Sequence, residues 1–154
     1  MESEKKTNAR RARPEDLGAV LALYRELRPD DPALSAAEAA ALWAKVRDTD
    51  PSLIVVAEHE DRIGATCMLA LIANLASGGR PIGFIEHVIT GAAFRRQGLG
   101  GACLKFALDE AWRRGCCKVV LLSGALRPEA HRLYEKLGFD GDAERGFVVK
   151  RPPG

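Results

Sequence analysis

The sequence predicts an α+β fold, with one mixed sheet covered by helices on both faces, and two observations support this prediction. Segments with helical periodicity alternate with short apolar runs typical of strands. The expected order is strand, helix, helix, three strands, helix, strand, helix and a closing strand hairpin, which favours a mixed sheet. No linker or repeat divides the 154 residues, a length near that of one ordinary domain. We therefore predict a single domain over residues 1–154, with residues 1–8 flexible.

The first elements are a short strand and two helices. The strand is placed near Ala9–Arg13, and the first helix begins at Pro14, because proline is well tolerated at a first helical position. Ser35 and Glu38 have the spacing of a capping box and predict the start of a second helix. This helix is expected to bury three apolar side chains: Ala39, Leu42 and Val46.

Apolar runs separated by turn residues predict the rest of the sheet. The expected strands are Leu53–Ala57, Ile63–Leu75, Ile82–Thr90, Lys118–Leu122, and a terminal hairpin made of Phe139 and Phe147–Val149. Two amphipathic segments predict helices, from about Gly98 to Arg114 and from Pro128 to Gly138.

Charge and cysteine usage narrow the function classes. The formal net charge is +2, so no strong overall field favours nucleic acid, and no aromatic residue accompanies the basic amino terminus before Tyr24. The four cysteines fit neither a zinc site nor a Cys-x-x-Cys redox pair, and we expect no metal. No signal sequence and no apolar run of membrane-spanning length is evident, so we expect a cytoplasmic protein that binds neither membrane nor nucleic acid.

The segment after Ile82–Thr90 has the chemistry of a phosphate-binding loop. Glycines follow two arginines at the start of a helix, where backbone N–H groups lack partners and the helix dipole is positive. The loop comprises Arg95, Arg96, Gln97, Gly98, Leu99, Gly100 and Gly101. A Gly-rich turn that only links strand to helix would explain the glycines equally well. A dinucleotide fingerprint fails, because its first glycine would fall on Arg96.

Two motifs in this order resemble the GNAT superfamily of N-acetyltransferases. Arg95, Gly98 and Gly100 match its Gln/Arg-x-x-Gly-x-Gly/Ala signature, and Ala130–Phe139 looks like its Leu-Tyr-x-Lys-x-Gly-Phe segment. The stretch from Ile85 to Thr90 is also similar to the glucosamine-6-phosphate N-acetyltransferase branch.

The resemblance implies acetyl-CoA as the acetyl donor. The backbone of Val88, Ile89 and Thr90 would pair with its pantetheine arm, and the loop from Arg95 to Gly101 would hold its pyrophosphate. Arg127 stands where the family often has a cofactor-contacting Asn, and whether it replaces that contact is an open question at this point.

The catalytic candidates are Tyr134 and Glu86. By its family position Tyr134 would protonate the leaving thiolate, since a phenol with an ordinary pKa near 10 is a suitable donor; alternatively it is a core residue of an apolar helix stripe. Glu86 is the candidate base, and strand alternation predicts that it shares a face with Phe84, Val88 and Thr90, with His87 opposite. Direct attack by an already neutral amine needs no base.

The acceptor is expected to be a primary amine of a small molecule or peptide. Acidic residues between Pro29 and Asp50 would suit a cationic amine, whereas Arg80, Arg127 and Arg132 would suit a sugar phosphate. The sequence does not decide between them. A non-catalytic acetyl-CoA sensor is the alternative function, and a homodimer formed through exposed terminal strands is expected.

Overall fold

The computed structural model describes residues 7–48, 51–124 and 127–154. The chain divides into two compact units, Met1–Leu121 and Leu122–Gly154, each of which is described by itself. Within the described residues, the first unit contains a five-stranded sheet and three α-helices, and the second contains one α-helix. The single domain expected over residues 1–154 stays a prediction.

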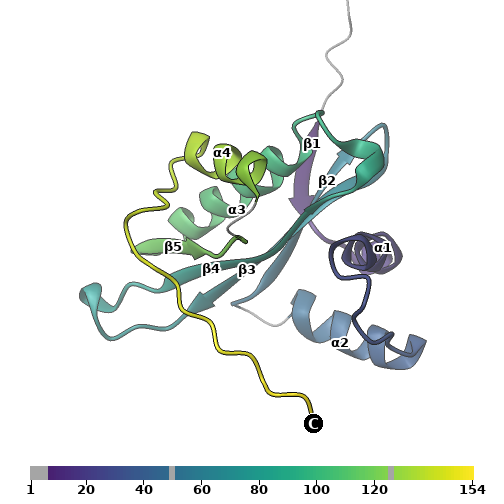
Figure 1. Cartoon of the computed structure of the whole chain (residues 1–154), viewed down its shortest axis with the longest axis horizontal. Helices are drawn as coiled ribbons and strands as arrows, with labels where there is room; N and C mark the ends of the chain where they lie inside the picture. Colours follow the sequence, from purple (N-terminus) through teal and green to yellow (C-terminus); the bar gives the residue numbers. More distant parts are fainter. Residues whose placement is uncertain (1–6, 49–50, 125–126) are drawn as a thin grey trace, which may run out of the picture. The chain divides into compact units, whose positions relative to one another are not determined.

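The sheet of the first unit is mixed, as the sequence predicts (Figure 1). Its strands, in spatial order, are β1 (Asn8–Arg11), β2 (Leu53–His59), β3 (Arg62–Ile72), β4 (Ile82–Thr90) and β5 (Lys118–Leu121). Neighbours from β1 to β4 pair antiparallel, and β4 pairs with β5 in parallel. The predicted fold class and the bounds of β4 are confirmed.

Helices cover both faces of this sheet, α1 (Leu17–Leu27) and α2 (Ala36–Asp48) one face and α3 (Leu99–Arg113) the other (Figure 1). On the α3 side, the Cys67 Sγ of β3 lies 3.7 Å from the Cys103 carbonyl oxygen. In the described residues, no helix is both long and apolar enough to span a bilayer.

The α1 and α2 side of the sheet has its own apolar cluster, and its composition corrects one prediction. Its buried members are Ala12, Val20, Trp43, Ile54 and Val56. Leu42, expected inside, is 46% exposed, whereas Trp43 is 8% exposed and its indole N–H donates to the Pro14 carbonyl at 3.1 Å. Both residues are apolar, so periodicity alone does not choose between them. The larger ring with a hydrogen-bond acceptor in reach takes the buried position.

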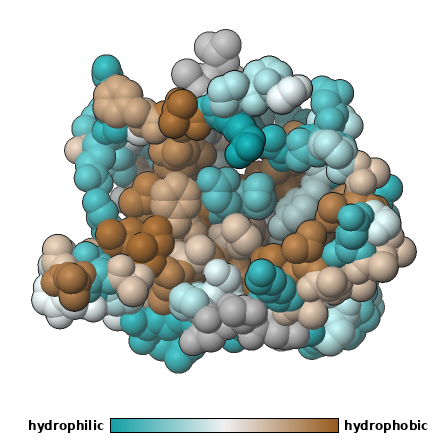
Figure 2. Space-filling view, turned by 90° about the horizontal axis from the view of Figure 1, so that it is seen from below, coloured by the Kyte–Doolittle hydropathy of each residue, from teal (hydrophilic) through white to brown (hydrophobic). Residues whose placement is uncertain are grey.

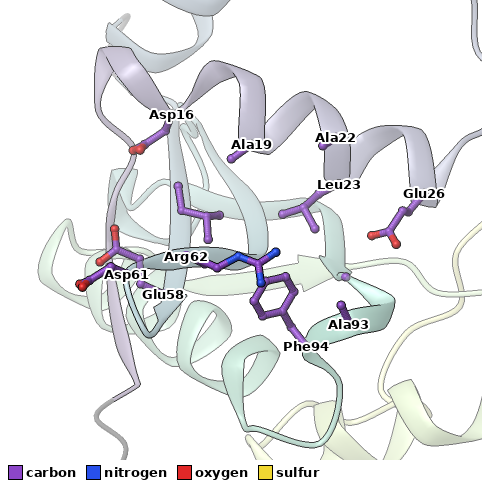
Figure 3. Close-up of a pocket in the computed structure, with 12 residues that line it drawn as sticks. Asp16, Ala19, Ala22, Leu23, Glu26, Glu58, Asp61, Arg62, Ala93 and Phe94 are labelled. Atoms are coloured by element: carbon purple, nitrogen blue, oxygen red, sulfur yellow. The ribbon is translucent and has the colours of Figure 1, made fainter.

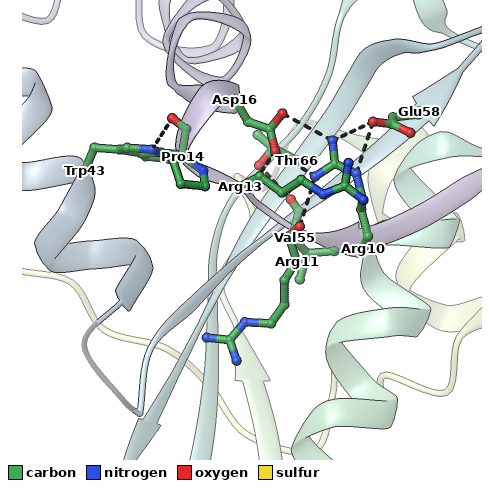
Figure 4. A network of polar contacts seen from close by, with 9 residues as sticks. All are labelled: Arg10, Arg11, Arg13, Pro14, Asp16, Trp43, Val55, Glu58 and Thr66. Atoms are coloured by element: carbon green, nitrogen blue, oxygen red, sulfur yellow. Dashed lines mark hydrogen bonds and ion pairs between the residues drawn. The ribbon is translucent and has the colours of Figure 1, made fainter.

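A charged network joins β1 to the start of α1 (Figure 4). The guanidinium of Arg10 donates to Asp16 at 2.7 Å and also to Glu58, and the Arg13 N–H donates to Asp16 at 2.6 Å. Burial opposes ionisation of Asp16, but these hydrogen bonds outweigh it and lower the pKa of its carboxyl group. The network fixes the entry of α1 against the sheet.

The second unit contains α4 (Pro128–Lys136), and no strand follows it within residues 137–154. The predicted terminal hairpin is therefore wrong. Phe147 and Val149 are 88% and 96% exposed. Side-chain type favours a strand here, but a strand also needs a backbone partner, and an isolated hairpin is only marginally stable in water.

Candidate functional site

The parallel pairing of β4 and β5 stops halfway along β4. Four residue pairs join the strands, from Ile82 with Lys118 to Ile85 with Leu121. β4 continues for five more residues, Glu86–Thr90, beyond the last of these pairs. β5 does not pair with the edge of this second half, so the backbone groups there need another partner, as a strand-like ligand could supply.

A bulge in β4 marks the point where the edge opens. His87 has a positive φ of 53°, and the register with β3 shifts between Thr66 and Met68. The shift leaves one extra residue on β4, as in a β-bulge, which bends a strand and turns its side chains. A bulge at this position separates the part of β4 that pairs with β5 from the part that does not.

The bulge corrects the predicted arrangement of side chains on β4. Glu86 pairs with Met68 and Ile89 with Thr66, so these four share the α1 side of the sheet, whereas Thr90 pairs with Ala65 on the other side. The prediction that Glu86 and Thr90 share a face is therefore wrong.

His87 also lies on the α1 side, against the prediction that it faces away from Glu86. Its ring centroid is 5.3 Å from that of Tyr24 in α1, which packs against the same apolar cluster as Met68. A left-handed residue interrupts the two-residue alternation that the prediction assumed. Burial raises the pKa of Tyr24 to about 12, so its hydroxyl keeps its proton at neutral pH.

Arg28 is a residue near Glu86 that the sequence analysis did not single out. It follows α1 and forms an ion pair with Asp31 at 2.7 Å. This hydrogen bond raises the pKa of Arg28, and the negative charge of Glu86 adds to the effect. An exposed cation at the end of α1 and an exposed carboxylate beside the bulge of β4 thus influence each other electrostatically. Sequence spacing gives no signal for this pairing, because the helix and the strand meet only in the fold.

The predicted phosphate loop has the backbone geometry that a phosphate site needs. Arg95, Arg96, Gln97 and Gly98 are exposed, and no ion pair of Arg95 or Arg96 is seen among the described residues. Arg96 and Gly98 have left-handed φ values of 63° and 75°. The Gly98 carbonyl accepts the Ala102 N–H at 3.0 Å, which is the first bond of α3.

The start of α3 consequently presents free donors. The first N–H groups of a helix have no acceptor within it, and no side chain caps this one. The N–H groups of Leu99, Gly100 and Gly101 follow two exposed arginines in the sequence. This arrangement can bind a pyrophosphate, and the segment Gly91–Phe94 connects it to the unpaired edge of β4.

The other predicted site residues belong to the second unit. Tyr134 is 8% exposed in α4, and its ring meets Phe139 edge to face with 6.1 Å between centroids. Arg127 precedes Pro128 at the start of α4, and its carbonyl accepts the His131 N–H at 3.1 Å. The structure thus brings together Glu86, the edge of β4 and the loop in one unit, and Tyr134 and Arg127 in the other.

Within the described ranges, no group of three His, Cys, Asp or Glu side chains is arranged to hold a metal ion.

The chain belongs to the acetyltransferase (GNAT) family, whose model matches residues 20–139.

Two curated relatives are named after the same N-acetyltransferase activity. A protein of Oryza sativa subsp. japonica, named "Probable glucosamine 6-phosphate N-acetyltransferase 2", is 36% identical over 113 residues, which cover 70% of this chain and 66% of the relative. The "Glucosamine 6-phosphate N-acetyltransferase" of Trypanosoma brucei brucei is 35% identical over 78 residues, or 51% of each chain. The matched part therefore spans between half and two thirds of these relatives.

A solved structure from Agrobacterium tumefaciens str. C58 extends the likeness to nearly the whole fold. It is 36% identical, covers 94% of this chain and 99% of its own, and superimposes with a TM-score of 0.87.

Proposed function

We propose that this chain transfers an acetyl group from acetyl-CoA directly to a primary amine of a small molecule. The observation that supports this most is the edge of β4 that β5 leaves unpaired, which is followed, after Gly91–Phe94, by the exposed Arg95 and Arg96 and by the uncapped start of α3. We further propose a cytoplasmic location, where its four free cysteines would stay reduced.

The cofactor would extend from the edge of β4 to the start of α3. Its pantetheine amides would pair with the backbone of Val88–Thr90, as an added strand pairs with a sheet edge. Its pyrophosphate would accept hydrogen bonds from Gly98–Gly101 N–H groups and from Arg95 and Arg96. In the second unit, Arg127 is proposed as an additional cationic contact.

The acetyl transfer needs at most one general base and one general acid. The amine nitrogen attacks the thioester carbonyl, the C–S bond breaks, and the thiolate takes a proton. Tyr134 is proposed to donate that proton. Glu86, exposed beside the bulge where the edge opens, is proposed to accept the proton that the amine loses.

The acceptor we propose is an amine that also carries an anionic group. Glu86 would face the amine, and Arg28, which is exposed and lies near Glu86, would bind the anion after exchanging its bond to Asp31. The names of the two curated relatives make glucosamine 6-phosphate the first compound to test. A neutral amino sugar and a peptide amine are the comparison acceptors.

The test is an acceptor screen with acetyl-CoA in which released CoA thiol is measured. Glucosamine 6-phosphate should give the highest kcat/KM, and Glu86→Gln should lower it by about 100- to 10,000-fold because the base is lost. Asp109→Asn removes an equal charge from the outer face of α3, where Asp109 pairs with Lys105, and should leave turnover unchanged. Acetyl-CoA binding without CoA release for any acceptor would favour the sensor alternative.

We also propose that the chain forms a homodimer through Phe147–Val149. These three side chains are at least 67% exposed, and exposed apolar surface commonly marks an interface. Figure 2 shows apolar surface, in brown, interspersed with hydrophilic surface in teal. Sedimentation velocity should show a dimer that Phe147→Asp dissociates. Leu75→Asp, at another fully exposed apolar residue, is the control. A wild-type monomer at all concentrations would contradict the proposal.

A further inference from the structure

The segment Gly91–Phe94 connects the two parts of the proposed cofactor site. It follows Thr90, the last residue of the open edge of β4, and precedes the loop Arg95–Gly101. It contains a 3₁₀ turn, Ala92–Phe94. Pantetheine and pyrophosphate belong to one molecule, so the position of this turn determines how well both can be bound at the same time.

β3 holds one side of this segment. The Gly91 N–H donates to the Gly64 carbonyl at 2.8 Å, and the Phe94 N–H donates to the Gly91 carbonyl at 2.9 Å. The Phe94 ring packs against Gly64, where a Cβ would collide with it. The Arg62 guanidinium lies over the same ring, 4.9 Å from its centroid. These contacts hold both ends of the segment, and none of them involves the Ala92 N–H.

A side chain from α1 binds the first N–H of the turn. The residue before the turn is Gly91, which has no side chain that could accept this hydrogen bond as an ordinary N-cap does. The Glu26 carboxylate accepts the Ala92 N–H at 3.3 Å. Hydrogen bonds to a carboxylate are stronger than those between neutral groups. Glu26 thus supplies, from another element, the cap that the local sequence lacks.

α1 approaches the segment closely at the same point. A Cβ at Gly91 would lie 3.1 Å from Glu26 Oε2 and 3.1 Å from Leu23 Cδ2, closer than ordinary van der Waals contact. Leu23 and Glu26 are three residues apart and share one face of the helix. Figure 3 shows this face on the side of Ala93 and Phe94. Because Gly91 has no side chain, this face of α1 reaches the turn.

We propose that Glu26 is a positioning residue for acetyl-CoA, whose carboxylate holds the turn in the place that cofactor binding requires. This inference rests on the proposed function, because it assigns Ala92–Phe94 to the middle of the cofactor site. A loop that is already held in its bound conformation binds a ligand more tightly, since binding does not have to order it. Without Glu26 the turn has more conformations in the free protein, and only some of them align the two parts of the site.

Calorimetry with acetyl-CoA on three variants tests this role. Glu26 is exposed, so its replacement should leave the fold unchanged. Glu26→Ala removes the acceptor and should raise the dissociation constant about 5-fold. Glu26→Gln keeps a carbonyl oxygen that can accept the Ala92 N–H, so its dissociation constant should stay within about twofold of the wild-type value. Glu15→Ala, which removes the same type of side chain from an exposed position before α1, should bind as the wild type does.

The direction of the change separates positioning from charge. Acetyl-CoA is an anion, so the loss of a negative charge alone would strengthen its binding, in Glu26→Ala and in Glu26→Gln alike. Weaker binding by Glu26→Ala together with restored binding by Glu26→Gln requires the hydrogen bond. Wild-type or tighter binding by Glu26→Ala overturns the role, and so does an equal loss in Glu26→Gln.

Steady-state kinetics with the best acceptor of the screen provide a second measurement. In Glu26→Ala the KM for acetyl-CoA should rise about 5-fold, while kcat at saturating acetyl-CoA stays within about twofold of the wild-type value. A lower kcat with an unchanged KM overturns the proposal. If the wild type itself does not bind acetyl-CoA, the proposed function fails and this role fails with it. Wild-type binding without a difference in Glu26→Ala excludes the positioning role alone.

Discussion

Replacing Gly98 with Glu should weaken acetyl-CoA binding by about 100-fold or more, equivalent to roughly 3 kcal/mol. No atom lies within 4 Å of the position that a Cβ would take at Gly98, so the new side chain projects into open space in front of α3. There it places a negative charge among the donors proposed for the pyrophosphate. Calorimetry on the folded variant measures the loss.

Gly115→Glu is the matched control for this substitution. Gly115 follows the other end of α3, has a φ of 82° against 75° at Gly98, and likewise has open space around its Cβ position. Both variants should lose about 1 kcal/mol of stability from the left-handed backbone. Only Gly98→Glu should lose binding. Equal acetyl-CoA affinities in the two variants would show that the loop is not part of the cofactor site.

Replacing Tyr134 with Phe should lower turnover by about 100- to 10,000-fold, with little change in acetyl-CoA affinity. The substitution keeps the ring that packs against Phe139 and removes only the hydroxyl. A proton donor to the thiolate acts as charge develops on sulfur, so its loss lowers the rate of the chemical step more than binding. Single-turnover kinetics and calorimetry on the same variant measure the two effects.

Tyr24→Phe is the comparison, since Tyr24 and Tyr134 are the two tyrosines of the chain. Tyr24 lies against His87, and burial raises its pKa to about 12, which makes it a poorer proton donor than an ordinary phenol. We expect the turnover of Tyr24→Phe to stay within a few-fold of the wild-type value. If Tyr134→Phe instead costs about 1 kcal/mol of stability with wild-type chemistry, then Tyr134 is a packing residue. A large loss of turnover in Tyr24→Phe would instead identify Tyr24 as the proton donor.

Sequence patterns predicted the elements with strong local signals. The capping box at Ser35 and Glu38 forms with hydrogen bonds of 2.9 and 3.2 Å. The loop from Arg95 to Gly101 likewise lies at the start of α3, as its glycines indicated. In each case a few adjacent residues determine the backbone, so tertiary contacts are not needed to recognise it.

The wrong predictions concern features that depend on contacts between residues far apart in the sequence. Leu42 and Trp43 are both apolar, and only the Pro14 carbonyl, 29 residues away, favours burial of the indole. The bulge at His87 inverts the faces of β4, but it depends on the register with β3. Phe147–Val149 has strand-like side chains without a strand to pair with.

The bulge at His87 also limits the length of unpaired strand that the protein exposes, and with it the risk of aggregation. A long, flat, open edge recruits strands from other molecules and leads to aggregation. Here the open part of β4 is short, because the left-handed residue at 87 kinks it at one end and a 3₁₀ turn beginning at Ala92 ends it at the other. Only Val88–Thr90 remains between them, which suits the few amides of a thin flexible ligand but is too short for lasting pairing with another strand. The same local distortion that makes room for a ligand thus protects the empty protein from self-association along this edge.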